Sequence, residues 1–113
     1  MEAEALNENG HPDLAVVPYN KVRKRAKMKE AAATISQDDL RSLIRMERWK
    51  ELAFEGHRAF DLRRWYTGDH LKQYYENVKY PYAENFQIGK HELLPIPLPD
   101  LQANPNLKQN PGY

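Results

Sequence analysis

The spacing of apolar residues divides the chain into a helical part and a proline-rich part. Apolar residues recur every three or four positions before residue 81, whereas six of the eight prolines lie at position 81 or later. We therefore expect helices over residues 1–80 and an extended tail over residues 81–113 that packs on them, all within one domain.

Glycine and proline mark the ends of the first two predicted helices. A short helix over residues 4–8 should stop at Gly10, where a left-handed backbone is tolerated, and Pro12 should open the next helix. Pro18 either kinks this second helix or marks its true start. Its buried face should be formed by Tyr19, Val22 and Ala26, at spacing i, i+3, i+7.

The clearest helix start is at Ser36. Its hydroxyl can accept a hydrogen bond from the Asp39 amide while the Asp39 side chain reaches back, and Ile35 and Leu40 are placed as a hydrophobic staple. The apolar residues that follow cover more than one stripe, which indicates neighbours on more than one side. They are Leu40, Leu43, Ile44, Met46, Trp49, Leu52, Ala53 and Phe54. Gly56 should end or bend this helix.

Two further helices are predicted before the tail. One over residues 57–66 should close at Gly68, after which Asp69 can cap the next. That last helix carries Leu71, Tyr74, Tyr75 and Val78 at i, i+3, i+4, i+7. The chain is thus expected to be mainly α, with four or five helices.

The tail combines apolar side chains with residues that cannot donate backbone hydrogen bonds. Residues 93–99 contain three prolines, which favours an extended segment lying against the helices. Asn104-Pro105 is a turn signal, and Asn110-Pro111-Gly112 suits a type II turn with Gly112 at the position of positive φ.

Composition limits the chemistry that the chain can perform. The 113 residues include no cysteine, so disulfides, thiolate metal sites and cysteine nucleophiles are excluded. No run approaches the ~20 apolar residues of a membrane helix. The opening residues lack the basic start and apolar middle of a signal peptide. The net charge of +1 gives no global reason to expect a polyanionic partner.

The basic run over residues 21–29 has two interpretations. Its Lys and Arg side chains could contact phosphates of a nucleic acid. A solvated helix face is favoured, because Glu30 follows and no known nucleic-acid-binding motif accompanies the run. We expect Arg23 and Arg25 to pair with acids on the next helices.

Glu47, Glu51 and Glu55 recur every four residues along one predicted helix side. Paired carboxylates serve glycosidases and dimetal sites, but a glycosidase pair must flank one bond from opposite sides in different environments. Basic residues within one turn instead indicate a structural ion-pair lattice. Its members are Glu47, Arg48, Glu51, Glu55, Arg58, Asp61 and Arg64. The spacing of the histidines fits neither a bundle dimetal site nor a zincin, so no metal site is predicted.

The aromatic residues of the second half could form a sugar-stacking platform. They are Tyr66, Tyr74, Tyr75, Tyr80, Tyr82 and Phe86. Packing is the favoured interpretation, because Tyr74 and Tyr75 lie on the predicted buried stripe. The tail prolines are two residues apart, so the tail has no PxxP motif for an SH3 domain.

Taken together, these motifs resemble the carboxy-terminal region of the SusD/RagB family. The matching segments, in the family's order, are Glu4-Ala5-Leu6-Asn7-Glu8-Asn9-Gly10, Asn20-Lys21-Val22-Arg23-Lys24-Arg25-Ala26, Glu47-Arg48 with Glu51-Leu52-Ala53-Phe54-Glu55-Gly56, Arg58, Asp61-Leu62 and Arg64-Trp65, Pro95-Ile96-Pro97, and Asn104 to Tyr113. Lys27 stands where the family often has glycine, and Tyr66 where it often has a small residue.

The resemblance implies a fold of tetratricopeptide-like helix pairs and a function without catalysis or cofactor. Family members are several times longer outer-membrane lipoproteins that bind glycans and dock on a SusC-type TonB-dependent transporter. Their signal and acylated cysteine are absent from this sequence, so the chain is expected to be truncated at its amino terminus. The resemblance gives the ion-pair lattice a structural role and assigns no glycan-binding residue to this chain.

Two other functions are open on the residues alone. One is an autonomous helical-repeat module that binds proteins. The other is a glycan hydrolase that uses Glu47, Glu51 or Glu55, which the geometry of a single stripe disfavours.

Overall fold

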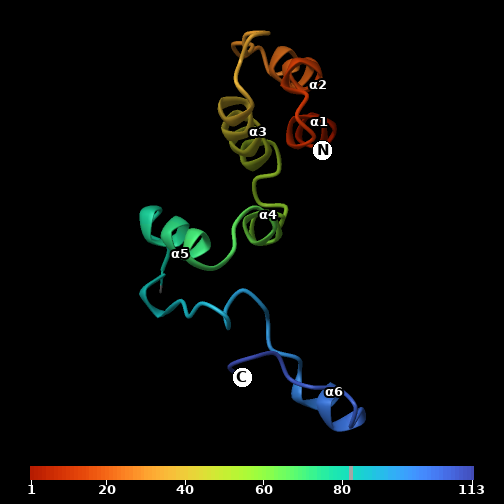
Figure 1. Cartoon of the computed structure of the whole chain (residues 1–113), viewed down its shortest axis with the longest axis vertical. Helices are drawn as coiled ribbons and strands as arrows, with labels where there is room; N and C mark the ends of the chain where they lie inside the picture. Colours follow the sequence, from red (N-terminus) through yellow and green to blue (C-terminus); the bar gives the residue numbers. More distant parts are fainter. Residues whose placement is uncertain (82) are drawn as a thin grey trace. The chain divides into compact units, whose positions relative to one another are not determined.

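A computed structural model of the chain describes residues 1–81 and 83–113, and these form two compact units, Met1–Gly56 and His57–Tyr113. Among the described residues there are α-helices and one short 3-10 turn but no strand, which confirms the prediction of a mainly α fold (Figure 1). The division into a helical part and a tail at residue 81 stays a prediction.

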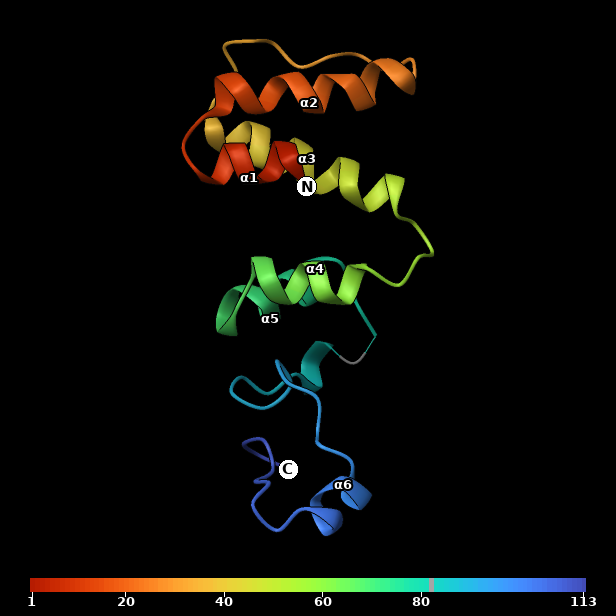
Figure 2. The same ribbon diagram turned by 90° about the vertical axis from the view of Figure 1, so that its right-hand side faces the viewer.

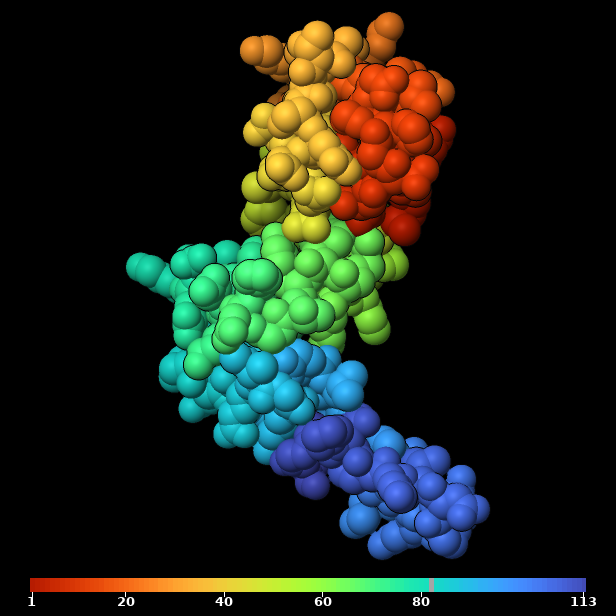
Figure 3. All heavy atoms as spheres, viewed as in Figure 1, coloured from red at the N-terminus to blue at the C-terminus, as the bar shows by residue number. Residues whose placement is uncertain are grey.

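Unit 1 consists of three helices packed around a small core. They are α1 (Glu2–Glu8), α2 (Pro12–Arg25) and α3 (Gln37–Glu51). Figure 2 shows them side by side, with the connection from α2 to α3 running back along α2. In Figure 3 the atoms of α2 (red to orange) lie against those of α3 (yellow). The core comprises Ala15, Val16, Tyr19, Leu40 and Ile44, flanked by Ala3, Leu6, Ala31 and Ile35.

Local signals fixed the starts of these helices as predicted. Gly10 has φ +83 after α1, and Pro12 is the first residue of α2. The Ser36 hydroxyl accepts the Asp39 amide at 3.1 Å and donates to the Asp39 carboxylate at 2.6 Å. Pro18 lies inside α2, so the prediction that it might mark the helix start is wrong. Its missing N–H removes one bond to the preceding turn, and the core contacts of Val16 and Tyr19 hold the helix on both sides.

Helix α3 is shorter than its apolar pattern suggested. It ends at Glu51, five residues before Gly56, and Ala53 and Phe54 lie beyond it. The Glu55 N–H donates to the Leu52 carbonyl at 3.2 Å, closing a turn in which Phe54 has φ +66 and a fully exposed side chain. With no apolar contact holding Phe54, nothing offsets the cost of continuing the helix.

Unit 2 contains α4 (Arg58–Trp65), α5 (Gly68–Asn77), the 3-10 turn η1 (Ala83–Asn85) and α6 (Leu98–Ala103). Residues Tyr66 and Thr67 join α4 to α5 (Figure 1). The N-cap of α5 is Thr67, so the assignment of this cap to Asp69 is wrong. Gly68, with φ +50, turns the chain into the helix, and Asp69 lies in the first turn, where its charge still suits the helix dipole.

The tail is not extended throughout, because α6 begins at Leu98. Pro99 occupies one of the first helical positions, where a missing N–H costs nothing and a fixed φ favours the helix. The turn signals were right: the Leu107 N–H donates to the Asn104 carbonyl at 3.0 Å, and Gly112 has φ +86. The C-terminal residues lie against the segment near residue 93 (Figure 3, dark blue on lighter blue), where the Tyr113 hydroxyl donates to the Leu93 carbonyl at 3.1 Å.

Side-chain amides tie together stretches of backbone that are distant in the sequence. Asn7 and Gln37 each donate to the other's backbone carbonyl, at 3.0 and 2.5 Å. The Asn20 side chain binds both backbone groups of Ala31: it donates to the Ala31 carbonyl at 2.9 Å and accepts the Ala31 N–H at 2.8 Å. Gln109 does the same for Ile96, at 2.9 and 2.8 Å. We call these three contacts the carboxamide bridges. The bridge between Asn7 and Gln37 joins α1 to α3, whereas those at Ala31 and Ile96 satisfy backbone groups of residues outside regular structure.

Candidate functional site

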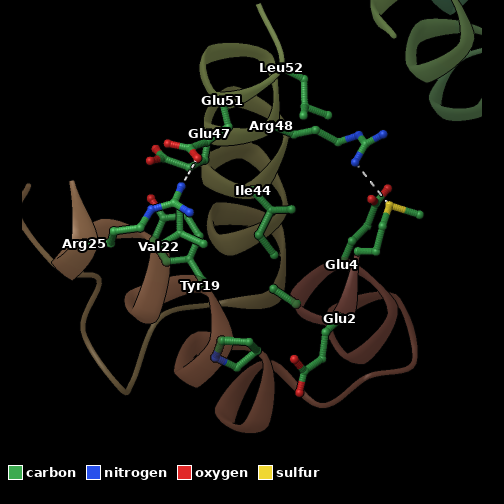
Figure 4. Close-up of a pocket in the computed structure, with 13 residues that line it drawn as sticks. Glu2, Glu4, Tyr19, Val22, Arg25, Ile44, Glu47, Arg48, Glu51 and Leu52 are labelled. Carbon is green, nitrogen blue, oxygen red and sulfur yellow. Dashed lines mark hydrogen bonds and ion pairs between the residues drawn. The ribbon is translucent and has the colours of Figure 1, made fainter. Parts of the chain in front are cut away.

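Unit 1 contains a charged pocket of about 350 Å³ where the three helices meet (Figure 4). It is lined by Met1, Glu2, Ala3, Glu4, Pro18, Tyr19, Val22, Arg25, Ile44, Glu47, Arg48, Glu51 and Leu52. In Figure 4, Arg25 of α2 points toward Glu47 and Glu51 of α3, and Arg48 points to the other side, toward Glu4 of α1.

The carboxylates on α3 are held by arginines of α2, as expected from the sequence. Arg23 donates to Glu47 at 2.8 Å, and both side chains are nearly buried, with exposures of 14% and 10%. Arg25 pairs with Glu51 in a more exposed position. The Arg23 Nε also donates to the Lys29 carbonyl at 3.0 Å, which ties down the basic segment.

Burial at this ion pair also affects Tyr19. Desolvation raises the pKa of the Tyr19 phenol, Arg23 lowers it and Glu47 raises it. The phenol is therefore neutral at physiological pH and packs beside the pair as part of the core. The arrangement joins two helices, as a partly buried, hydrogen-bonded ion pair can.

The predicted stripe of three glutamates is interrupted by the end of α3. Glu55 lies beyond the helix, whereas Glu47 and Glu51 are on it. Each of these two carboxylates is held by its own guanidinium partner in an ion pair between helices, so neither is turned toward a substrate bond as a glycosidase acid or nucleophile must be. The pocket therefore gives no support to hydrolysis.

The remaining lattice residues lie at three places. Arg48 donates to the Met1 sulfur at 3.2 Å in unit 1. In unit 2, Arg64 donates to the buried Asp61 at 2.9 Å, the i, i+3 pair expected from the sequence. Arg58 donates to the Tyr74 hydroxyl, and its guanidinium lies 5.7 Å from the Trp65 ring centroid. The structural role of the lattice stays a prediction.

Unit 2 contains a continuous aromatic cluster. Tyr66 stacks on Tyr74 with centroids 5.4 Å apart, and Tyr74 meets Tyr75 at 6.1 Å. Tyr75 contacts Tyr80 at 5.0 Å and Phe86 at 5.5 Å. The cluster continues into the tail through His91 and Tyr113. Tyr82, the other aromatic residue singled out from the sequence, lies outside the described residues.

One side of this cluster forms an aromatic pocket of about 360 Å³. It is lined by Ala59, Arg63, Tyr75, Tyr80, Pro81, Ala83, Asn85, Phe86 and His91. Burial raises the pKa of the Tyr75 phenol, and the nearby Arg63 charge lowers it. The aromatic residues of unit 2 thus pack against one another, as the favoured interpretation expected, and some of them also line a pocket.

Arg63 was not singled out from the sequence, although a signal was present. The residues three and four positions away on either side are Ala59, Phe60, Tyr66 and Thr67, none of them acidic. An arginine with no acid within one helical turn has no local ion-pair partner.

Neither metal binding nor membrane crossing finds support in the part of the chain that the structure describes. Residues 1–81 and 83–113 bring no three His, Asp or Glu side chains together as metal ligands. None of the helices described here combines the length and apolar character needed to span a bilayer.

Comparison with known proteins finds a matching family and two similar proteins. The model of the SusD family matches residues 1–113. SusD-like protein P2 of Formosa agariphila is 38% identical over 122 residues, covering all of this chain and 24% of that protein. SusD-like protein P25 of the same organism is also 38% identical, covering all of this chain and 23% of that protein. The chain thus spans about a quarter of the length of these relatives. No solved structure matches the chain.

Proposed function

The chain belongs to the SusD family, and on that basis we propose that it is the carboxy-terminal part of a glycan-binding lipoprotein on the outer membrane. The complete protein delivers oligosaccharides to a SusC-type TonB-dependent transporter. It acts by binding and carries out no catalysis.

The family match over the whole chain carries this proposal. It covers residues 1–113, and two relatives named as SusD-like proteins are each 38% identical to the chain over 122 residues. The carboxy-terminal position rests on the order of the motifs, from the helix before Gly10 to the closing turn at Gly112.

The geometry of unit 1 supports a scaffold role for this part. Arg23 pairs with Glu47 across α2 and α3 in a nearly buried position, and Arg25 pairs with Glu51 in a more exposed one. Groups paired in this way fix helix register and have little capacity left for a ligand.

Binding measurements on the complete protein test the proposal. The full-length lipoprotein should bind an oligosaccharide in isothermal titration calorimetry, release no reducing ends from it, and co-purify with a TonB-dependent transporter encoded beside it. Protease treatment of intact cells should remove it from the surface. A full-length protein that binds a folded protein partner and no glycan would instead support a helical-repeat interaction module.

A further inference from the structure

Arg63 brings a guanidinium group to the lining of the aromatic pocket. Its Nε is buried and has no hydrogen-bond partner within residues 1–81 and 83–113. The nearest acid on α4, Asp61, is engaged by Arg64 at 2.9 Å. A buried donor without an acceptor is destabilising, so this atom is a favourable place for an acceptor supplied by a ligand.

The walls around Arg63 present aromatic faces. Tyr75 and Phe86 are half-buried, with centroids 5.5 Å apart, and Tyr75 also contacts Tyr80, which is 57% exposed. Apolar ring faces of this kind stack against flat or puckered rings that have one apolar side. A volume of about 360 Å³ lies within the ~300–1,000 Å³ common for ligand pockets.

The charge of the lining distinguishes this pocket from the one in unit 1. The described lining of the aromatic pocket includes Arg63 and His91 and no carboxylate. The charged pocket is lined by four glutamates, of which Glu51 is paired with Arg25 and Glu47 with Arg23. An anion is therefore attracted to the aromatic pocket and repelled by the charged pocket.

We propose that the aromatic pocket binds one sugar residue bearing a carboxylate or sulfate group. The sugar ring stacks on the Tyr75, Tyr80 and Phe86 faces, and its anionic group accepts hydrogen bonds from the Arg63 guanidinium. This rests on the proposed glycan-binding function and adds to it a site and a substrate class, the acidic oligosaccharides.

Calorimetry on the complete lipoprotein tests the site with three oligosaccharides of equal length. One is an oligogalacturonide, which has carboxylates, one is a sulfated galactan oligosaccharide, and one is a neutral galactan oligosaccharide. The variants are Arg63→Gln, Arg63→Lys and Tyr80→Ala. Lys108→Gln is the matched control for loss of a cation, since Lys108 is exposed and lies outside the pocket. Phe60→Ala is the control for loss of an aromatic ring, since Phe60 is 70% exposed and does not line the pocket.

We expect the wild type to prefer one or both acidic oligosaccharides, with affinity that falls as salt rises. Arg63→Gln should weaken that binding about tenfold or more, because it removes charge-assisted hydrogen bonds, and should leave neutral binding unchanged. Arg63→Lys should recover part of the loss. Tyr80→Ala should weaken binding of every oligosaccharide that the pocket accepts, by roughly two- to tenfold. Which acidic ligand is preferred distinguishes a carboxylate from a sulfate site.

Three results would overturn the proposal. If the wild type binds the neutral oligosaccharide as tightly as the acidic ones, or if Arg63→Gln matches the Lys108→Gln control, the acidic site is wrong while glycan binding by the protein stands. If the wild type binds none of the three oligosaccharides, nor any other glycan, the proposed function itself fails. Each variant should melt within a few degrees of the wild type, which separates loss of the site from loss of the fold.

Discussion

The contact between Gln109 and Ile96 should control whether the tail holds its conformation. Ile96 stands between Pro95 and Pro97, so its N–H is the only backbone donor in that stretch. The Gln109 carboxamide accepts this N–H at 2.8 Å and donates to the Ile96 carbonyl at 2.9 Å. Its oxygen also accepts the Asn110 N–H at 2.8 Å.

Replacing Gln109 by Ala removes all three hydrogen bonds at once. Each net bond is worth roughly 0.5–1.5 kcal/mol, and a buried group left without a partner costs more. Ile96 is only half-buried, so water can replace part of the loss. We therefore expect the tail to open more easily by about 1–2 kcal/mol, which corresponds to roughly 5- to 30-fold faster amide exchange at Ile96.

Mass-spectrometric hydrogen exchange of the peptide containing Ile96, in the complete protein, measures this opening. Gln109→Glu should lie between the wild type and Gln109→Ala, because the carboxylate keeps the acceptor and loses the donor. Gln102→Ala is the control, since Gln102 is exposed on α6. Unchanged exchange at Ile96 in Gln109→Ala would refute the idea that this side chain holds the tail.

Three further substitutions test other parts of the structure. Lys27 has φ +55 and an exposed side chain, so Lys27→Gly should raise the unfolding free energy by about 0.5–1 kcal/mol; a lower urea midpoint would contradict this. Arg58→Met removes a hydrogen bond to Tyr74 and a contact with the Trp65 ring and should destabilise the protein by about 1–3 kcal/mol; an unchanged melting temperature with lost glycan binding would show a binding role instead. The Gly89 N–H holds the pKa of the Glu92 carboxyl below its ordinary 4.5. The stability that Glu92 contributes is thus present above that pH and lost as pH falls through the lowered pKa. Melting temperatures from pH 6 to pH 3 should fall less steeply in Glu92→Gln, and identical curves would contradict this.

Residues that act on their own backbone were the most predictable part of the fold. Ser36, Gly10 and Gly112 impose caps and turns within a few positions, and the structure has them where the sequence predicts. Lys27 is similar: the resemblance marks it as a position where glycine is common, and its left-handed backbone explains why.

Features that depend on distant neighbours were harder to predict. The apolar pattern through Phe54 suggested a longer α3, but helix length depends on whether apolar side chains find contacts, and the Phe54 side chain is fully exposed. The three prolines in residues 93–99 suggested an extended segment. Pro99, however, lies in the first turn of α6, where a helix tolerates proline.

The candidate sites were predictable to different degrees. Charge complementarity was enough to pair Arg23 and Arg25 with acids on the next helix, although not to say which acid. The aromatic residues of unit 2 were evident in the sequence, but which ring faces stay open depends on how α5, η1 and the tail pack. Arg63 has no acid three or four residues away, so the ion-pair spacing in the sequence did not single it out.

The carboxamide bridges also explain residue types within the segments that resemble the family. Asn7, Asn20 and Gln109 each belong to one of those segments. At Asn20 and Gln109 the side chain takes a backbone N–H and a backbone carbonyl together, which requires both an acceptor and a donor.

The same side chains are also sites where the protein can be damaged chemically during storage. Asparagine and glutamine are thermolabile, since heat hydrolyses their amides to carboxylates. At Asn20 or Gln109 that single reaction turns the donor facing a carbonyl oxygen into a negatively charged acceptor. Slow chemical damage during warm storage should therefore release the loop before α3 and the tail first, while the helices and their ion pairs are still intact.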